Sequence, residues 1–289
     1  MNNLKASELI LNDDGSIFHL HLLPHQIGEI IILVGDQSRV EMVSKYFDTV
    51  EHRVQNREFV THTGTLNGKK ISALSTGIGT DNIDIVLNEL DALVNIDLEK
   101  RAIKTTHKAL QLVRLGTSGA LQADIDVDSF VLSEYGLGMD GLLNFYVQND
   151  KFNQELKNEF IKQIEWPVHF NHPYIVRASA DLLKKLSPNT KQGITATACG
   201  FYGPQGRVLR LPTQIDNLNE RLTAFSYNGL RITNFEMETS ALYGLSALLG
   251  HHAATVCAII ANRIKKEFST NYKVAVEKMV TQVLEQLTK

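Results

Sequence analysis

The sequence has few of the features that would place a protein in a membrane, outside the cell or on a nucleic acid. Only two cysteines, Cys199 and Cys257, occur among 289 residues, and they form neither a disulfide framework nor a Cys-x-x-Cys pair. The polar start from Met1 to Asp14 lacks the basic and apolar parts of an export signal, and no later apolar run could cross a bilayer. We therefore expect a cytoplasmic protein.

The sequence also lacks a clear excess of charge of one sign and a set of residues at the spacing of metal ligands. Lysine and arginine number 29 against 32 acidic residues, and no basic block could follow a nucleic acid or an anionic membrane. His19 and His21 are expected to share one face of a strand, but no further ligands follow at metal spacing, and His251-His252 more simply ends a helix. We expect no metal and no organic cofactor. No nucleophile elbow, Walker loop or full dinucleotide fingerprint is present either.

What the sequence does contain is an alternation of short apolar runs and amphipathic segments. The run Glu29 to Val34 ends at Gly35-Asp36 and precedes a helical pattern from Arg39 to Phe47. Asn67-Gly68 predicts a hairpin between two strands. Those strands are 58–66 and 70–76, a helix is expected at 83–94, further strands at 112–115, 129–133, 193–196, 231–235 and 254–260, and a closing helix, with Val274 on its core face, at 272–287. This order predicts an α/β sheet covered on both faces, in a single domain over 1–289.

Three segments are expected to lie outside that sheet. Residues 1–16 are interpreted as an N-terminal extension. The charged segment Asp97 to Lys108 and the Gly- and Asn-containing segment Leu137 to Asp150 are candidate surface insertions. Structural decoration explains both insertions more simply than a role as lids.

Glycines and polar side chains follow several predicted strands, where open α/β sheets bind their ligands. Gly35 and Arg39 offer a backbone N–H and a guanidinium to an anion, although a Gly-Asp turn before a surface arginine is commonplace. Arg114 lies inside an apolar strand, directly before a Gly-Thr-Ser-Gly segment that contains Thr117. A charge there must face a buried carboxylate or an anionic ligand, and the residues alone leave both readings open.

Two further clusters have the chemistry to bind a nucleoside. A carboxylate of the pair Glu236 and Glu238 can accept from both vicinal hydroxyls of a ribose, although helix capping explains either residue alone. Gln205 offers a donor and an acceptor, Arg207 offers fixed donors, and Phe201 can stack on a ring, which together suit a uracil. Incidental polar groups in a Gly/Pro loop are the alternative.

Taken together and in this order, the clusters resemble the nucleoside phosphorylase family, which includes uridine phosphorylases and hexameric purine nucleoside phosphorylases. The resemblance runs from about Phe18 to Arg263. The motifs that carry it are Phe18-His19-Leu20, Gly35-Asp36 with Arg39, Arg57-Glu58-Phe59, Ser75-Thr76-Gly77-Ile78-Gly79, Arg114 through Ala120, Phe201 through Arg207, and Glu236-Met237-Glu238.

The resemblance implies a three-layer α/β/α fold around a mixed, partly barrel-like sheet. It also implies a site shared between subunits, with a dimer as the minimal active unit and a hexamer as a further option. Phosphate would be held by Gly35, Arg39, Arg114 and Thr117, with Arg57 from the neighbouring subunit. The nucleoside would be held by His19 from that same neighbour and by Phe201, Gln205, Arg207, Glu236, Met237 and Glu238, with Arg114, Gln205, Arg207 and Glu238 as the catalytic set. The resemblance leaves open whether a monovalent cation lies between subunits near Glu58 and Ser75.

The reaction implied is phosphorolysis of a pyrimidine nucleoside, uridine foremost, to free base and ribose 1-phosphate in nucleoside salvage. Gln205 with Arg207 favours a pyrimidine, and Thr197-Ala198-Cys199-Gly200 lacks the aspartate that purine-cleaving relatives place there. Gln37 and Thr80 depart from the family pattern without loss of phosphate groups, whereas Pro204 alters the segment ahead of Gln205. The alternatives are a purine nucleoside phosphorylase, a nucleosidase that uses water, and a nucleoside-binding relative without catalysis.

Overall fold

A large mixed sheet organises the chain in the computed structural model, which describes residues 3–289. The strands lie in the order β11-β12-β10-β8-β13-β7-β1-β4-β3-β2. Their bounds are β1 Ile30–Val34, β2 Thr49–Asn56, β3 Phe59–Leu66, β4 Lys69–Ser75, β7 Gln111–Ala120, β8 Phe130–Gly138, β10 Lys191–Thr197, β11 Ser226–Tyr227, β12 Leu230–Glu236 and β13 His252–Asn262. Two short strands extend this sheet, β9 (Tyr174–Arg177) beside β8 and β14 (Glu267–Phe268) beside β13.

One half of the sheet closes on itself. Strand β12 pairs with β10 in parallel and also with β7 in antiparallel orientation, through Phe235 opposite Gly119. Strands β12, β10, β8, β13 and β7 therefore form a closed ring, while β1, β4, β3 and β2 continue from β7 as an open sheet. The partly barrel-like mixed sheet is confirmed.

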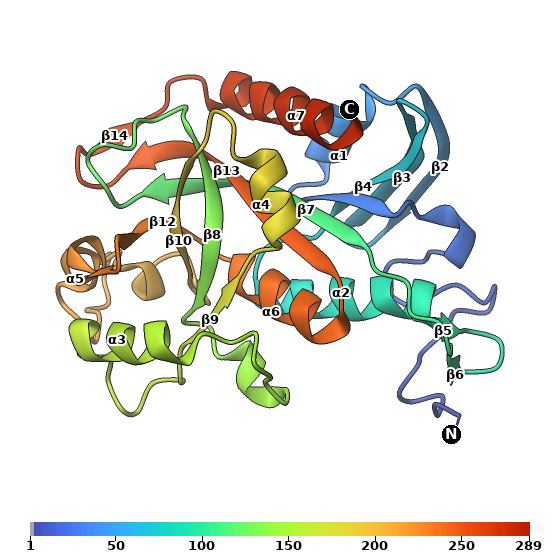
Figure 1. The fold of residues 1–289 in the computed structure, drawn as a ribbon, viewed down its shortest axis with the longest axis horizontal. Coiled ribbons are helices and arrows are strands. Elements are labelled where there is room, and N and C mark those ends of the chain that lie inside the picture. The colour runs from blue at the N-terminus through green and yellow to red at the C-terminus, as the bar shows by residue number, and fades with distance from the viewer. Residues whose placement is uncertain (1–2) are drawn as a thin grey trace.

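Helices cover both faces, as Figure 1 shows. The helices are α1 Ser38–Ser44, α2 Thr80–Asn95, α3 Gln154–Ile164, α4 Ala180–Leu186, α5 Leu218–Ala224, α6 Thr239–Leu249 and α7 Tyr272–Thr288. Helix α7 packs on β13 and β7 beside α1 and α4, whereas α6 packs on β8 and β13 beside α2 (Figure 1). The three-layer arrangement is confirmed. Among the residues described, no helix has both the length and the apolar character needed to span a membrane.

The apolar runs form strands because they are buried from both sides. All five residues of β1 are buried, and β1 pairs in parallel with β4 on one side and β7 on the other. Asn67 and Gly68 have φ angles of 50° and 73°, the left-handed pair that a tight hairpin requires, so β3 and β4 pair as expected.

The strand β2 was not expected. Its residues include Glu51, Arg53 and Gln55, and they alternate between exposed and partly exposed because β2 is the edge of the open sheet. Because a polar edge strand carries no apolar run, no hydrophobic pattern marked this segment as a strand.

Several other expectations need correction. Leu137 and Gly138 belong to β8, and Leu137 and Leu143 are fully buried, so the segment from Leu137 to Asp150 begins in the core and not at the surface. The segment Asp97 to Lys108 includes most of a two-stranded hairpin, β5 (Ile96–Asp97) with β6 (Ala102–Ile103). Helix α1 ends at Ser44, before the expected Phe47.

Two corrections concern side chains near the ends of the chain. His19 and His21 do not share a strand face, because the chain turns there and His21 has a φ of 54°. Instead, His21 Nε2 lies 3.1 Å from Asp14 Oδ2. On α7, Val276, Val280 and Leu287 are buried as expected, but Val274, in the first turn, is 46% exposed.

Candidate active site

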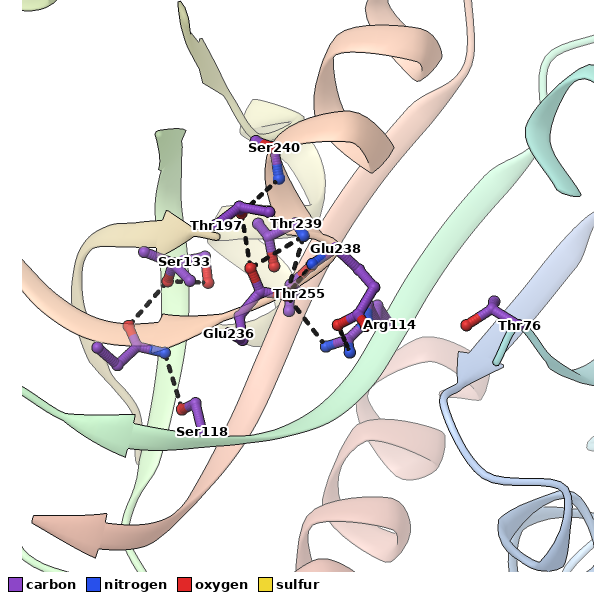
Figure 2. A network of polar contacts seen from close by, with 12 residues as sticks. Thr76, Arg114, Ser118, Ser133, Thr197, Glu236, Glu238, Thr239, Ser240 and Thr255 are labelled. Carbon is purple, nitrogen blue, oxygen red and sulfur yellow. Dashed lines mark hydrogen bonds and ion pairs between the residues drawn. The ribbon is translucent and has the colours of Figure 1, made fainter. Parts of the chain in front are cut away.

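Arg114 lies on β7 at the point where the open sheet meets the closed ring. It pairs with Leu33 of β1 on one side and Thr255 of β13 on the other, and it is only 5% exposed. Its Nη2 donates to Glu238 Oε2, and its Nη1 lies 3.4 Å from Glu236 Oε2 (Figure 2). Both interpretations of this buried arginine, a carboxylate partner and an anionic ligand, are compatible with these contacts. Two carboxylates pair with it, and part of its guanidinium makes no hydrogen bond among residues 3–289.

Two nitrogen atoms of the Arg114 guanidinium, Nε and Nη1, are buried and make no hydrogen bond within residues 3–289, although Nη1 lies within ion-pair distance of Glu236. Burial opposes the charge, but the carboxylates of Glu238 and Glu236 together raise the pKa of Arg114 above its ordinary value. The guanidinium is therefore a permanent cation, and its N–H groups without a partner could donate to an oxyanion.

The glycines around Arg114 make room for its side chain. A Cβ on Gly116 would lie 2.1 Å from Arg114 Nη1, so only glycine lets the guanidinium lie across the strand there. The segment from Gly116 to Gly119 was expected to be a loop, but β7 continues to Ala120 because β13 and β12 both pair with it. Thr117 thus lies on a strand, half-buried, and not on a phosphate loop.

Glu236 and Glu238 have different surroundings. Glu236 accepts from Thr197 Oγ1 at 2.6 Å and from the backbone N–H groups of Glu238 and Thr239, where α6 begins (Figure 2). It therefore holds the start of α6 in place, which is the capping alternative. Glu238 accepts from Gly79 N at 2.8 Å through Oε1 and from Arg114 through Oε2, and its burial raises its pKa. Met237 lies half-buried between the two.

Arg39 lies close enough to Arg114 for the two cations to affect each other. Burial and the charge of Arg114 lower the pKa of Arg39, and no carboxylate within residues 3–289 forms an ion pair with it. Its helix begins next to Gly35, whose carbonyl accepts from Gly77 N at 3.0 Å. Two close, partly desolvated guanidinium groups repel each other, and an anion between them would remove that repulsion.

Gln205 contacts both Arg207 and Arg263, and Arg263 was not predicted to belong to the site. Gln205 is 3% exposed, and its Oε1 accepts from Arg207 Nη1 at 2.7 Å and from Arg263 Nη2 at 2.6 Å. Arg263 Nη1 also donates to the Gln205 carbonyl at 2.6 Å. Burial, with a smaller effect of Arg207, lowers the pKa of Arg263 to about 10. Because Arg207 and Arg263 both donate to the amide oxygen, only the NH₂ group of Gln205 is available to a ligand, as a donor. The expectation that Gln205 offers both a donor and an acceptor is therefore wrong.

Phe201 is 52% exposed, and the guanidinium of Arg207 lies 3.8 Å from the centre of its ring. One face of this ring therefore already carries a cation. Stacking of a base on Phe201 stays a prediction.

His19 and Arg57 lie together, away from the other groups of the site. Asn56 Nδ2 donates to the His19 carbonyl at 2.8 Å, and the Arg57 guanidinium lies 5.6 Å from the Phe18 ring. His19 Nδ1 lies 2.6 Å from Glu89 Oε1, on α2. Glu89 is ten residues beyond Gly79, the residue that contacts Glu238, and this corresponds to about 15 Å along a helix. His19 therefore lies too far along α2 to serve the Glu238 of its own chain.

One cluster elsewhere combines residue types that can hold metals. Ligand-type atoms of Asp91, His107 and His251 lie within 4.8 Å of one another. However, His251 Nδ1 accepts from Leu110 N at 3.2 Å, so its Nε2, which faces Asp91, carries the ring hydrogen in the neutral form. A metal ligand needs the opposite tautomer, so these residues do not fit an ion as they are arranged. Helix α6 ends at Leu249, followed by Gly250 with a φ of 76°, so the helix ends ahead of the expected His251-His252, and His252 already begins β13.

The closed five-stranded ring, with a buried arginine paired to two carboxylates where the ring meets the open sheet, defines an α/β protein with a charged interior site. The chain belongs to the phosphorylase superfamily, whose family model matches residues 29–289.

Named relatives come from two branches of that superfamily. A uridine phosphorylase of Thermococcus kodakarensis is 29% identical over 269 residues, which is 91% of this chain and 83% of that protein. A purine nucleoside phosphorylase of the DeoD type from Clostridium perfringens is 28% identical over 256 residues, with 88% and 90% covered. A crystal structure of a Trypanosoma brucei nucleoside phosphorylase, described as showing uridine phosphorylase activity, has a TM-score of 0.87 at 28% identity and covers 96% of this chain and 99% of its own.

Proposed function

We propose that this protein cleaves uridine with inorganic phosphate to give uracil and ribose 1-phosphate. The observation that supports this most is the pairing of Arg114 with Glu238, while its buried Nε and Nη1 have no hydrogen-bond partner among residues 3–289. One side chain thus connects a carboxylate suited to ribose hydroxyls with donors suited to phosphate. The uridine phosphorylases among the relatives, and the segment Thr197-Ala198-Cys199-Gly200 without an aspartate, favour a pyrimidine over a purine.

At the sugar, phosphate would lie between Arg39 and Arg114, near Gly35 and Thr117. Glu238 would accept from the 2′ and 3′ hydroxyls of the ribose, with Met237 packed on the ring and Glu236 holding the backbone of that turn. As the bond between the sugar and the base breaks, positive charge grows on the ribose ring. The bound phosphate would stabilise that charge and then form the new bond at C1′, so positioning supplies much of the acceleration. No covalent enzyme intermediate is required.

At the base, negative charge grows on the uracil oxygens as the bond breaks. The Gln205 NH₂ group and the remaining donors of Arg207 would stabilise it, as an oxyanion hole does. Arg263 holds Gln205 by both its amide oxygen and its carbonyl, so the donor is fixed before the substrate arrives. A preorganised donor loses little free energy in reorganising when the charge develops.

A second copy of the chain would complete the site. His19 and Arg57 lie together but apart from Glu238, which supports a homo-oligomer in which the neighbour supplies both. The exposed Glu58 carboxylate has no ion-pair partner within residues 3–289, which supports a monovalent cation there, although Ser75 Oγ already donates to the Glu58 carbonyl. Unpaired cysteines support a place in cytoplasmic nucleoside salvage.

The test is an assay of uridine, thymidine, inosine and adenosine, each with and without phosphate. We expect uracil release from uridine only when phosphate is present, with ribose 1-phosphate as the second product. Faster cleavage of inosine would favour the purine alternative, and base release without phosphate would identify a nucleosidase. Tight binding of uridine with no product would indicate a binding protein.

A further inference from the structure

A large cavity lies beside the loop that carries Arg207. Its volume is about 970 Å³, and its walls come from the segment after α3, the loop from Cys199 to Arg207, and the segment that leads into α5. This volume is at the upper end of the range typical of small-molecule sites. Arg114, Glu238 and Gln205 do not line it. The cavity is therefore distinct from the sugar and phosphate groups and meets the base-side cluster through Arg207.

The walls of this cavity are mostly aromatic and aliphatic. Trp166 and Phe170 form one side and Tyr202 belongs to the loop, while Leu209 and Leu211 come from the segment before α5. Leu209 and Leu211 are 76% and 80% exposed, which is unusual for large apolar side chains that lie so close in sequence. Flat rings and exposed leucines around one hollow favour an aromatic ligand.

The charge of the cavity has one sign. Arg207 and Arg210 line it, and no aspartate or glutamate does so among the residues described. Arg210 has no ion-pair partner within residues 3–289, and Arg207 donates only to neutral acceptors, the Phe201 carbonyl and Gln205 Oε1. Burial lowers the pKa of Arg207, as expected for a cation without a counter-charge.

Burial raises the pKa of the Cys199 thiol, which lines the cavity, and the charge of the Asp140 carboxylate raises it further. Asp140 is already engaged, because Tyr174 Oη and Ser240 Oγ donate to it at 2.7 and 2.9 Å. It does not neutralise the two arginines of the cavity by an ion pair.

We propose that this cavity is a second ligand site, which binds a flat aromatic molecule with one anionic group. The ring would lie between Trp166 and the leucines, and the anion would bind Arg210 and Arg207. Phe201, whose ring lies against Arg207, does not line the cavity, so the ligand reaches this guanidinium from another side. A ligand there competes with the base for Arg207, and this competition alone rests on the proposed function.

Binding can be measured without nucleoside, because Trp166 is the single tryptophan of the chain. The probe is 8-anilinonaphthalene-1-sulfonate, and its control is N-phenyl-1-naphthylamine, which lacks only the sulfonate. We expect saturable energy transfer from Trp166 and at least about fivefold tighter binding of the anionic probe. Arg210→Gln should remove that preference. Arg231→Gln, at a surface arginine paired with Asp124, should keep it. Equal affinity of the two probes for the native protein would overturn the proposal.

The position of the probe can be tested at Cys199, which is exposed and lines the cavity, whereas Cys257 is buried. Saturating anionic probe should slow the alkylation of Cys199 by iodoacetamide several-fold, and an unchanged rate would place the probe elsewhere and overturn the site. The probe should also lower kcat/KM for uridine. In equilibrium binding, saturating probe should weaken uridine binding by the same factor as saturating uridine weakens probe binding.

Unchanged turnover while Cys199 is protected would overturn the competition for Arg207. A protein that binds the probe at Cys199 but never cleaves uridine, even without probe, would contradict the proposed function and leave the ligand site standing.

Discussion

Arg263 holds Gln205 by two oxygens at once, with Nη2 2.6 Å from the side-chain Oε1 and Nη1 2.6 Å from the backbone carbonyl. The residues are 58 positions apart, at the end of β13 and in the 3₁₀ turn Gly203–Gln205. This contact fixes which way the amide of Gln205 points, and so which of its groups can meet a base.

The first prediction follows from that contact. Gln205→Ala should lower kcat/KM for uridine by roughly two orders of magnitude, because polar base atoms would be left unpaired in a buried site. Arg263→Ala should lower it by about tenfold, because the amide is then free to rotate. Steady-state kinetics of both single variants and the double variant would test the coupling. We expect the double variant to be no worse than Gln205→Ala, and strictly additive losses would contradict the positioning role of Arg263.

The second prediction concerns the charge that develops on the base. Arg207→Ala should reduce kcat by roughly a hundredfold and change KM much less, because its donors matter most when the base carries negative charge. The loss should be smaller with 5-fluorouridine, since fluorouracil bears that charge more easily. Equal losses with both substrates would indicate that Arg207 only shapes the loop.

The third prediction concerns stability. If phosphate were the main partner of Arg114, an Arg114→Ala variant would keep its fold largely intact. In the structure, however, Arg114 pairs with two buried carboxylates. Arg114→Met should therefore lower the free energy of unfolding by about 3 to 5 kcal/mol, because Glu238 and Glu236 lose their counter-charge. Adding Glu238→Gln should restore part of it. Urea unfolding of the native protein and the two variants measures this, and equal stability of all three would rule the interpretation out.

The fourth prediction is a pH dependence at the start of α1. Asp36 Oδ1 accepts from Ser38 N at 2.7 Å and from Ser38 Oγ at 2.5 Å, and these bonds lower the pKa of Asp36. A carboxyl with a lowered pKa in the folded state stabilises it above the unfolded pKa, about 4. That contribution is lost as the pH falls through the lower folded value.

Melting temperatures of the native protein and Asp36→Ala should therefore differ at pH 7 and converge at pH values below about 4. Asp36→Asn, which keeps an acceptor without a charge, should lie between them at neutral pH. A difference between native protein and Asp36→Ala that stays constant from pH 7 to pH 3 would contradict this explanation.

The fifth prediction tests the shared site. Arg39→Ala and Arg57→Ala chains should each be nearly inactive as pure proteins. If Arg57 serves the neighbour, a hybrid dimer holds one site that lacks both arginines and one that is intact. Equal mixing after reversible dissociation should then restore activity at roughly a quarter of the sites. No recovery in verified hybrids would mean that both arginines serve their own chain.

The sequence alone was sufficient for the features that depend on local pattern. The Ile-rich run of β1, the Asn67-Gly68 hairpin and the amphipathic α2 and α7 all lie close to where periodicity and turn chemistry placed them. Family resemblance supplied the partly closed sheet, which no local pattern shows.

Three features depended on contacts distant in sequence and could not be predicted. The Gly116 to Gly119 segment extends β7 only because β12 and β13 pair with it. Arg263 directly follows an apolar strand. No motif around it indicates its role, although the family resemblance extends as far as this residue. The double pairing of Arg114 requires that β7 and the start of α6 meet, and they are 124 residues apart.

The closed ring also has a consequence for biosynthesis. Strand β7 ends at Ala120, but its neighbours β12 and β13 end at Glu236 and Asn262, so β7 lacks them while roughly 140 residues are added. At ordinary elongation rates this lasts about 7 to 28 s, during which Leu112, Val113 and Leu115 have a free strand edge beside them. A nascent chain that stalls before β13 therefore presents an apolar, unpaired strand and not a partial active site, and the ribosome must nearly finish the protein before Arg114 acquires its surroundings.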